Sequence, residues 1–135
     1  MTWRIIIAAG AALFVSACGG GTDSPAGSGL EGEAARGKAL FVEACAICHN
    51  AAPADAAGIA RTGPDLFGVF GAPAGRLDYA YSSRLRNSGL VWDEPTLEAF
   101  LASPQTSLPG NRMSYGGEPD AANRKAIIDY LKTLH

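Results

Sequence analysis

The sequence predicts an all-α fold for residues 31–135, and three observations support it. Apolar residues recur at intervals of three and four in several segments, which is the spacing of one helix face. No segment alternates convincingly between apolar and polar residues, and no internal repeat is present. The connecting segments 50–75 and 105–118 are long and rich in glycine and proline, so we expect these loops to enclose a bound group.

Residues 1–17 have the features of an export signal. Arg4 is followed by an apolar run over residues 5–15, which is shorter than the roughly 18 residues needed to cross a bilayer. The run ends in Val-Ser-Ala-Cys, which is similar to a bacterial lipobox. We therefore expect Cys18 to be lipidated and to become the first residue of the mature chain. The alternative is an ordinary signal peptide with a chance cysteine.

Residues 18–30 are predicted to be a lipidated cysteine followed by a flexible linker. The segment is composed mainly of Gly, Ser, Thr, Asp and Pro and has almost no side chain to bury. The chain is thus divided into a signal peptide (1–17), a tether (18–30) and one folded domain (31–135). This organisation predicts a lipid anchor on the periplasmic side of a bacterial membrane.

The first helix is expected to begin near Glu31 and Glu33, because carboxylates in a first turn complement the helix dipole. Its apolar face contains four residues spaced by three and four, namely Gly37, Leu40, Phe41 and Ala44. A glycine inside a helix costs about 1 kcal/mol relative to alanine. Gly37 therefore indicates a place where another backbone approaches closely.

Three further helices are predicted. A short one runs from Ser82 or Ser83 to Gly89. Asp93 can cap the next helix, which Pro104 ends, and Asp120 can cap the last one. The apolar stripes of these two longer helices are Leu97, Phe100 and Leu101 in one, and Ile127, Ile128, Leu131 and Leu134 in the other.

The motif that carries chemistry is Cys-Ala-Ile-Cys-His at residues 45–49. A Cys-x-x-Cys-His run is the attachment signature of haem c. Cys45 and Cys48 on one helical turn can bond the two vinyl groups of a porphyrin edge, and His49 can then ligate the iron.

Three other readings of the motif compete with haem attachment. A thioredoxin-type dithiol would need a βαβ context, and a zinc site would need a second ligand pair. The only other cysteine and histidine are Cys18 and His135. A local disulfide would leave His49 unexplained.

Met113 is the expected second ligand of the iron. The chain has two methionines, and Met1 leaves with the signal peptide. Met113 follows Pro, Gly, Asn and Arg in a turn-rich loop, which does not suit a core filler. His135 is the rival ligand, but a terminal residue tends to fray. Ligation by His and Met raises the potential and closes the coordination sphere, which favours an electron carrier over a catalyst.

From Gly37 to the C-terminus the sequence resembles a class I cytochrome c. Besides the haem motif, the resemblance rests on Gly37–Phe41, on Thr-Gly-Pro-Asp-Leu at 62–66, on Leu-Pro-Gly-Asn-Arg-Met at 108–113 and on Tyr-Leu at 130–131. It implies the class I fold, in which short helices and long loops surround one covalently bound haem c. It also implies that the last helix crosses the first near Gly37 and Phe41.

The resemblance further implies roles for three residues around the haem. The Pro64 carbonyl would accept the Nδ1–H of His49 and orient the imidazole. Tyr81 and Trp92 match positions whose polar hydrogens bond a haem propionate. Two departures from the family concern residues expected near the haem. Phe100 stands where a tyrosine is frequent. Ala72 stands where many members have a propionate-facing arginine, which leaves open whether Arg76 replaces it.

The function expected from these features is that of a membrane-tethered, monomeric carrier of single electrons without catalytic residues. A net charge of −2 gives no reason to expect a nucleic-acid partner. The family implies a quinol–cytochrome c oxidoreductase or a periplasmic dehydrogenase as donor and a terminal oxidase or reductase as acceptor. Two alternatives stay open. One is a fixed haem subunit of a multi-component periplasmic oxidoreductase. The other is a haem sensor or peroxidase, should Met113 not be a stable ligand.

Overall fold

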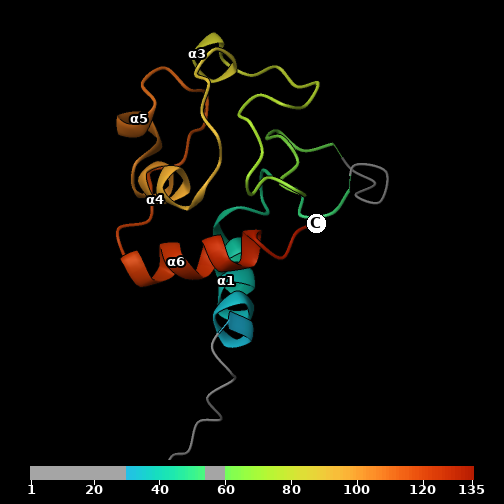
Figure 1. Cartoon of the computed structure of the whole chain (residues 1–135), viewed down its shortest axis with the longest axis vertical. Helices are drawn as coiled ribbons and strands as arrows, with labels where there is room; N and C mark the ends of the chain where they lie inside the picture. Colours follow the sequence, from blue (N-terminus) through green and yellow to red (C-terminus); the bar gives the residue numbers. More distant parts are fainter. Residues whose placement is uncertain (1–29, 54–59) are drawn as a thin grey trace, which may run out of the picture.

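The computed structural model describes residues 30–53 and 60–135, so the predicted signal peptide and Cys18 lie outside the described residues. Five helices are placed along this part of the chain (Figure 1): α1 (Leu30–Ala44), α3 (Ser83–Arg86), α4 (Glu94–Ala102), α5 (Pro104–Ser107) and α6 (Ala121–Leu131). Extended pairing in the described ranges is limited to an isolated antiparallel bridge between Pro73 and Val91. The all-α prediction is confirmed.

Helices α1 and α6 cross each other, as Figure 1 shows. A Cβ atom on Gly37 would lie 1.8 Å from the carbonyl oxygen of Ala126, so the two backbones approach too closely for any side chain at this position. One turn further along α1, the Phe41 ring meets the Tyr130 ring edge-on, with 5.3 Å between the centroids. The predicted close approach at Gly37 is confirmed, and so is the implied position of the crossing.

The predicted N-caps of the two longer helices are present. The Asp93 carboxylate accepts a 2.9 Å hydrogen bond from the Thr96 amide at the start of α4. The Asp120 carboxylate accepts from the first amides of α6, at distances of 2.7 and 3.1 Å. Both caps satisfy backbone donors that have no partner within the helix.

One detail of the helix predictions is wrong, and one helix was not predicted. The short helix ends at Arg86 rather than Gly89, and Gly89 adopts a positive φ of 66° that breaks the helical path. Pro104 ends α4 as predicted, and it also opens the unpredicted helix α5, since proline suits the first turn of a helix. Ala44, predicted on the apolar face of α1, has an exposed side chain that lines a cavity of the domain.

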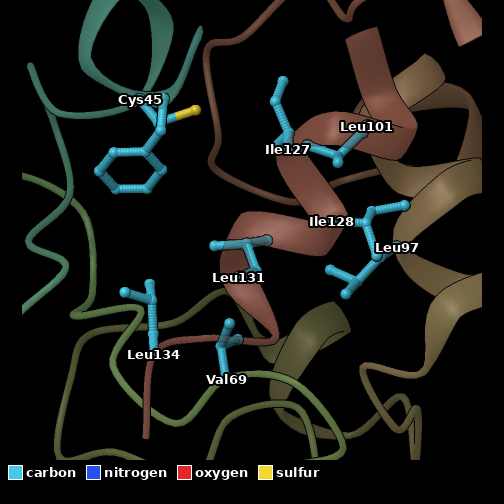
Figure 2. Close-up of a cluster of buried hydrophobic side chains, with 9 residues drawn as sticks. Cys45, Val69, Leu97, Leu101, Ile127, Ile128, Leu131 and Leu134 are labelled. Atoms are coloured by element: carbon cyan, nitrogen blue, oxygen red, sulfur yellow. The ribbon is translucent and has the colours of Figure 1, made fainter. Parts of the chain in front are cut away.

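The hydrophobic core gathers side chains from α1, α4, α6 and the loops between them (Figure 2): Phe41, Cys45, Val69, Leu97, Leu101, Ile127, Ile128, Leu131 and Leu134. The predicted stripes of α4 and α6 therefore point inward, and Leu134 is buried just beyond the end of α6. All members except Ile128 and Leu134 also line one large cavity. The core is thus built around a space rather than around packed side chains alone.

Candidate functional site

The cavity has a volume of about 470 Å³, which lies within the range of roughly 300–1,000 Å³ that is typical of ligand pockets. Its apolar wall comes from α1, α4 and α6, and includes Phe41, Leu97 and Ile127. Polar side chains reach it from the loops before and after α4. A mostly apolar space with a few placed polar groups suits a bulky apolar cofactor.

All residues predicted to hold a cofactor line this cavity. They come from five separate parts of the chain and are Cys45, Cys48, His49, Pro64, Tyr81, Trp92 and Met113. The rival ligand His135 is exposed, does not line the cavity and has its Nδ1 3.1 Å from the Lys132 carbonyl oxygen. The structure therefore brings Met113, and not His135, to the same space as His49.

Turns that continue α1 position the Cys-x-x-Cys-His motif. The amides of Cys48 and His49 both donate to the Cys45 carbonyl oxygen, at 3.0 and 2.9 Å. Cys45 and Cys48 are free thiols, so the local disulfide is not formed. Burial raises the pKa of the Cys45 thiol to about 11, so the thiol is neutral at pH 7. In the described ranges, no three His, Cys, Asp or Glu side chains cluster to hold a metal ion.

His49 is held in one tautomer. Its Nδ1 lies 2.7 Å from the Pro64 carbonyl oxygen, and because a carbonyl oxygen only accepts, Nδ1 donates. Nε2 is then left with its lone pair. Burial lowers the pKa of the imidazole, while the bond to Pro64 and the nearby Asp65 carboxylate act in the opposite direction. A neutral imidazole with a free Nε2 is a ready metal ligand.

Gly63 completes the wall behind this imidazole. A Cβ atom there would lie 2.6 Å from Cε1 of His49 and 2.7 Å from its Nδ1. The Gly63 amide also donates a 2.7 Å bond to the Cys48 carbonyl oxygen. Gly63 belongs to the Thr-Gly-Pro-Asp-Leu motif, but its role could not be predicted from the sequence, because the need for a glycine arises only where the two segments meet.

Two further residues without a predicted role, Asn111 and Gln105, contact the backbone of Met113. Asn111 is buried and lines the cavity, and Gln105 lies on α5. Their side-chain amides form hydrogen bonds with the backbone of Met113. The Pro-Gly-Asn sequence of this loop was a usable signal for Asn111, since asparagine in a turn commonly bonds the amide two residues on. No local signal marks Gln105.

The remaining predicted residues, Tyr81 and Trp92, also line the cavity. The Trp92 ring packs edge-on against Phe100, with 4.9 Å between the centroids. Burial raises the pKa of the Tyr81 hydroxyl. Arg76 also lines the cavity, and its guanidinium donates to the Phe67 carbonyl oxygen. A charged guanidinium and two polar ring groups thus border an otherwise apolar space.

Taken together, the donor set fits a covalently attached haem. Two thiols lie in the order and on the turn that attachment requires, and a neutral imidazole with a free nitrogen follows them directly. A thioether borders the same apolar cavity from another loop. No side chain in this set is in a state that contradicts the assignment.

The comparisons with known proteins agree on one family. The family model described as Cytochrome c matches residues 34–135. Cytochrome c2 iso-2 of Magnetospirillum molischianum is 44% identical over 91 residues, which cover 67% of this chain and 90% of that protein. Cytochrome c of Theileria annulata is 39% identical over 102 residues, which cover 76% and 86%. The solved structure of cytochrome cH from Methylobacterium extorquens is 40% identical, with a TM-score of 0.66 over 74% of this chain and 97% of that one.

Proposed function

The chain belongs to the cytochrome c family, and we propose from this that it is a lipid-anchored electron carrier on the periplasmic side of a bacterial membrane. Like its relatives it carries one covalent haem c and transfers electrons rather than catalysing a reaction. The observation that carries the proposal is that Cys45, Cys48, His49 and Met113 all line one apolar cavity.

In this proposal each residue around the cavity has a defined task. Cys45 and Cys48 would hold the haem covalently, and His49 and Met113 would bind its iron. Pro64 fixes the imidazole through the 2.7 Å bond to Nδ1. Tyr81 and Trp92 would donate to the propionates, and Arg76, which also lines the cavity, would supply a positive charge. The haem, when bound, supplies reversible one-electron chemistry at iron.

The surrounding side chains favour transfer over catalysis. The apolar walls from α1, α4 and α6 exclude water from most of the site, and this limits the solvent rearrangement that accompanies a change of charge. With Met113 as well as His49 bound to the iron, no position would be left open for oxygen or peroxide. This closed coordination separates a carrier from the sensor or peroxidase alternative.

The substitution Met113→Ala tests the ligand assignment. The chain is produced with haem-attachment machinery, and carbon monoxide binding and the reduction potential are measured. We expect the wild type to be low-spin and to bind no carbon monoxide, and the variant to bind it and to have a lower potential, because the thioether stabilises the ferrous state. Gly116→Ala is the matched control in the same loop, since a Cβ there meets nothing within 4 Å. Ready binding of carbon monoxide by the wild type would favour a sensor or peroxidase.

The proposed partners are those of a respiratory carrier. A quinol–cytochrome c oxidoreductase or periplasmic dehydrogenase would be the donor, and a terminal oxidase or reductase the acceptor. Contacts of this kind are small and short-lived. The fixed-subunit alternative is tested by purification from detergent extracts. A free carrier elutes as a monomer, whereas a subunit remains in one stoichiometric complex.

The anchor is proposed from the sequence of residues 15–18 and from the division into signal (1–17), tether (18–30) and domain (31–135). Within the part of the chain that the structure describes, no helix is both long and apolar enough to span a membrane. We expect wild-type chain in the membrane fraction and Cys18→Ser in the soluble periplasmic fraction, both with haem attached. Equal fractionation of the two would remove the lipid anchor from the proposal.

A further inference from the structure

We propose that Asn111 and Gln105 form an amide clamp that holds Met113 in place for ligation. Both are positioning residues, since they act on the backbone of Met113 and not on the iron. The inference rests on the proposed function, in which Met113 would be a ligand of the haem iron. It goes beyond that function by naming what keeps this ligand in the cavity.

Asn111 has every hydrogen-bonding position of its side chain in use. It is 9% exposed, and its Nδ2 donates to the carbonyl oxygens of Pro104 and Leu108, both at 2.8 Å. Its Oδ1 accepts a 2.8 Å bond from the Met113 amide and a 3.3 Å bond from Gln105 Nε2. A primary amide has two donor hydrogens and two acceptor lone pairs, so no other residue of this shape meets the same four partners.

Gln105 holds the other side of Met113. Its Nε2 donates a 2.9 Å hydrogen bond to the Met113 carbonyl oxygen. The backbone N–H of Met113 is therefore bound by Asn111 and its backbone C=O by Gln105. Both bonds come from side chains, in a stretch from Asn111 to Asp120 where the chain has no regular secondary structure.

The clamp is anchored on α5. Gln105 belongs to this helix, and the Pro104 carbonyl that Asn111 binds lies at its first residue. Pro104 is itself fully buried, so it fixes α5 against the core. A ligand on an irregular loop loses affinity through the conformational freedom that binding must remove. By fixing both peptide groups of Met113 beforehand, the clamp reduces that cost and slows departure of the thioether.

The test compares Gln105→Met, Asn111→Asp and the control Ser107→Ala in haem-loaded protein. Gln105→Met keeps side-chain length and removes the donor at an exposed position. Asn111→Asp keeps the shape but turns an oxygen towards the two carbonyl oxygens of Pro104 and Leu108. Ser107 lies exposed on the same helix. The measured quantity is the rate at which imidazole displaces the thioether from ferric iron, followed by loss of the far-red thioether–iron absorption band.

We expect displacement to be about fivefold faster in Gln105→Met, the factor for one ordinary hydrogen bond. For Asn111→Asp, which loses two donors, we expect about 100-fold or loss of the band altogether. Ser107→Ala should exchange at the wild-type rate. Melting temperatures of the same proteins show whether the acceleration exceeds what global destabilisation accounts for.

Two outcomes overturn the clamp, and they are distinguishable. Wild-type exchange rates in Gln105→Met and Asn111→Asp, with the band intact, would refute the clamp while Met113 remains the ligand. A wild type that lacks the band and binds imidazole as fast as Met113→Ala would refute the proposed function and the clamp together. Should Asn111→Asp not fold, Gln105→Met decides the question alone, because its side chain is exposed.

Discussion

The imidazole of His49 is fixed by two neighbouring residues that act differently. Pro64 has a carbonyl oxygen that accepts from Nδ1 and sets the tautomer. Gly63 has no side chain and therefore leaves room for the imidazole ring. Both lie on the segment that returns to the haem motif, and the Gly63 amide bonds the Cys48 carbonyl oxygen. Ring orientation is therefore decided by a loop that is distant from His49 in the chain.

Gly63→Ala should shift this imidazole. The new Cβ would lie within 2.7 Å of two ring atoms and 2.8 Å from the Cys48 carbonyl oxygen, which is closer than such atoms approach. We expect a loss of about 1–3 kcal/mol in stability from overpacking and an altered pattern of haem methyl shifts in the NMR spectrum of the ferric protein. Gly116→Ala, which has open space, should change neither. Unchanged shifts in Gly63→Ala would mean that the ring does not depend on this contact.

The sequence predicted those site residues whose chemistry is local. Cys45, Cys48 and His49 form one motif, and Met113 was found by elimination because few sulfur ligands exist in the chain. Gly63 and Gln105 could not be found in this way. Their roles depend on contacts with residues on other segments. A glycine or a glutamine in a sequence does not by itself indicate such a contact.

At the scale of elements, the crossing of α1 and α6 depends on Gly37. An interior Gly→Ala change in a helix normally gains about 1 kcal/mol. Here the added methyl would overlap the Ala126 carbonyl and approach the Tyr130 Cβ to 2.9 Å. We expect Gly37→Ala to lower the free energy of unfolding by about 1–3 kcal/mol or more, measured by denaturant titration. Lys38→Ala, one exposed position along, is the control. A stabilised Gly37→Ala protein would show that the helices can separate without cost.

A buried carboxylate links α6 to α4. The Asp129 side chain is 2% exposed and receives hydrogen bonds from Lys125 at 2.5 Å and Lys132 at 3.0 Å, while Lys132 also binds Glu94 of α4. Burial alone would raise the pKa of Asp129, but the two lysines outweigh it and hold that pKa below its ordinary value. The ionised carboxylate is thus favoured by the folded state.

This arrangement predicts a pH-dependent difference between wild type and Asp129→Asn. Because the pKa is lower in the folded chain, the stabilisation is complete above the unfolded pKa of about 3.9 and is lost as pH falls through the folded pKa. At pH 7 we expect Asp129→Asn to be about 1–3 kcal/mol less stable. The two proteins should converge in urea titrations as the pH falls through the lowered pKa of folded Asp129. A difference that is constant with pH would exclude the carboxylate charge as its source.

The helix predictions succeeded where a capping side chain and an apolar stripe agree. Asp93 and Asp120 set the starts of α4 and α6, and both stripes are buried. Pro104 ends α4 as predicted, but the sequence did not predict that α5 begins there, although proline is also favoured in the first turn of a helix. Helix α5 has only four residues and therefore no periodicity from which it could be recognised.

At the scale of the whole molecule, the domain lacks a core that is independent of its cofactor. Most of the buried cluster in Figure 2 lines the cavity of about 470 Å³. Residues that line this cavity lose packing partners when the cofactor is absent, and an unfilled cavity destabilises a fold in proportion to its volume. An ordinary domain, with a whole stability of about 5–15 kcal/mol, has little to offset such a loss.

We therefore expect the chain made without haem attachment to lose cooperative folding, even though its helices have good caps and stripes. Circular dichroism should show residual helix in the far ultraviolet but no fixed aromatic signal in the near ultraviolet, and heating should give no sharp transition. The haem-loaded protein at the same pH and salt is the control. A dispersed NMR spectrum and a single sharp melting transition in the haem-free chain would contradict this. They would mean that α1, α4 and α6 can close onto one another, and that the cavity is a consequence of the fold rather than a space that the cofactor must fill.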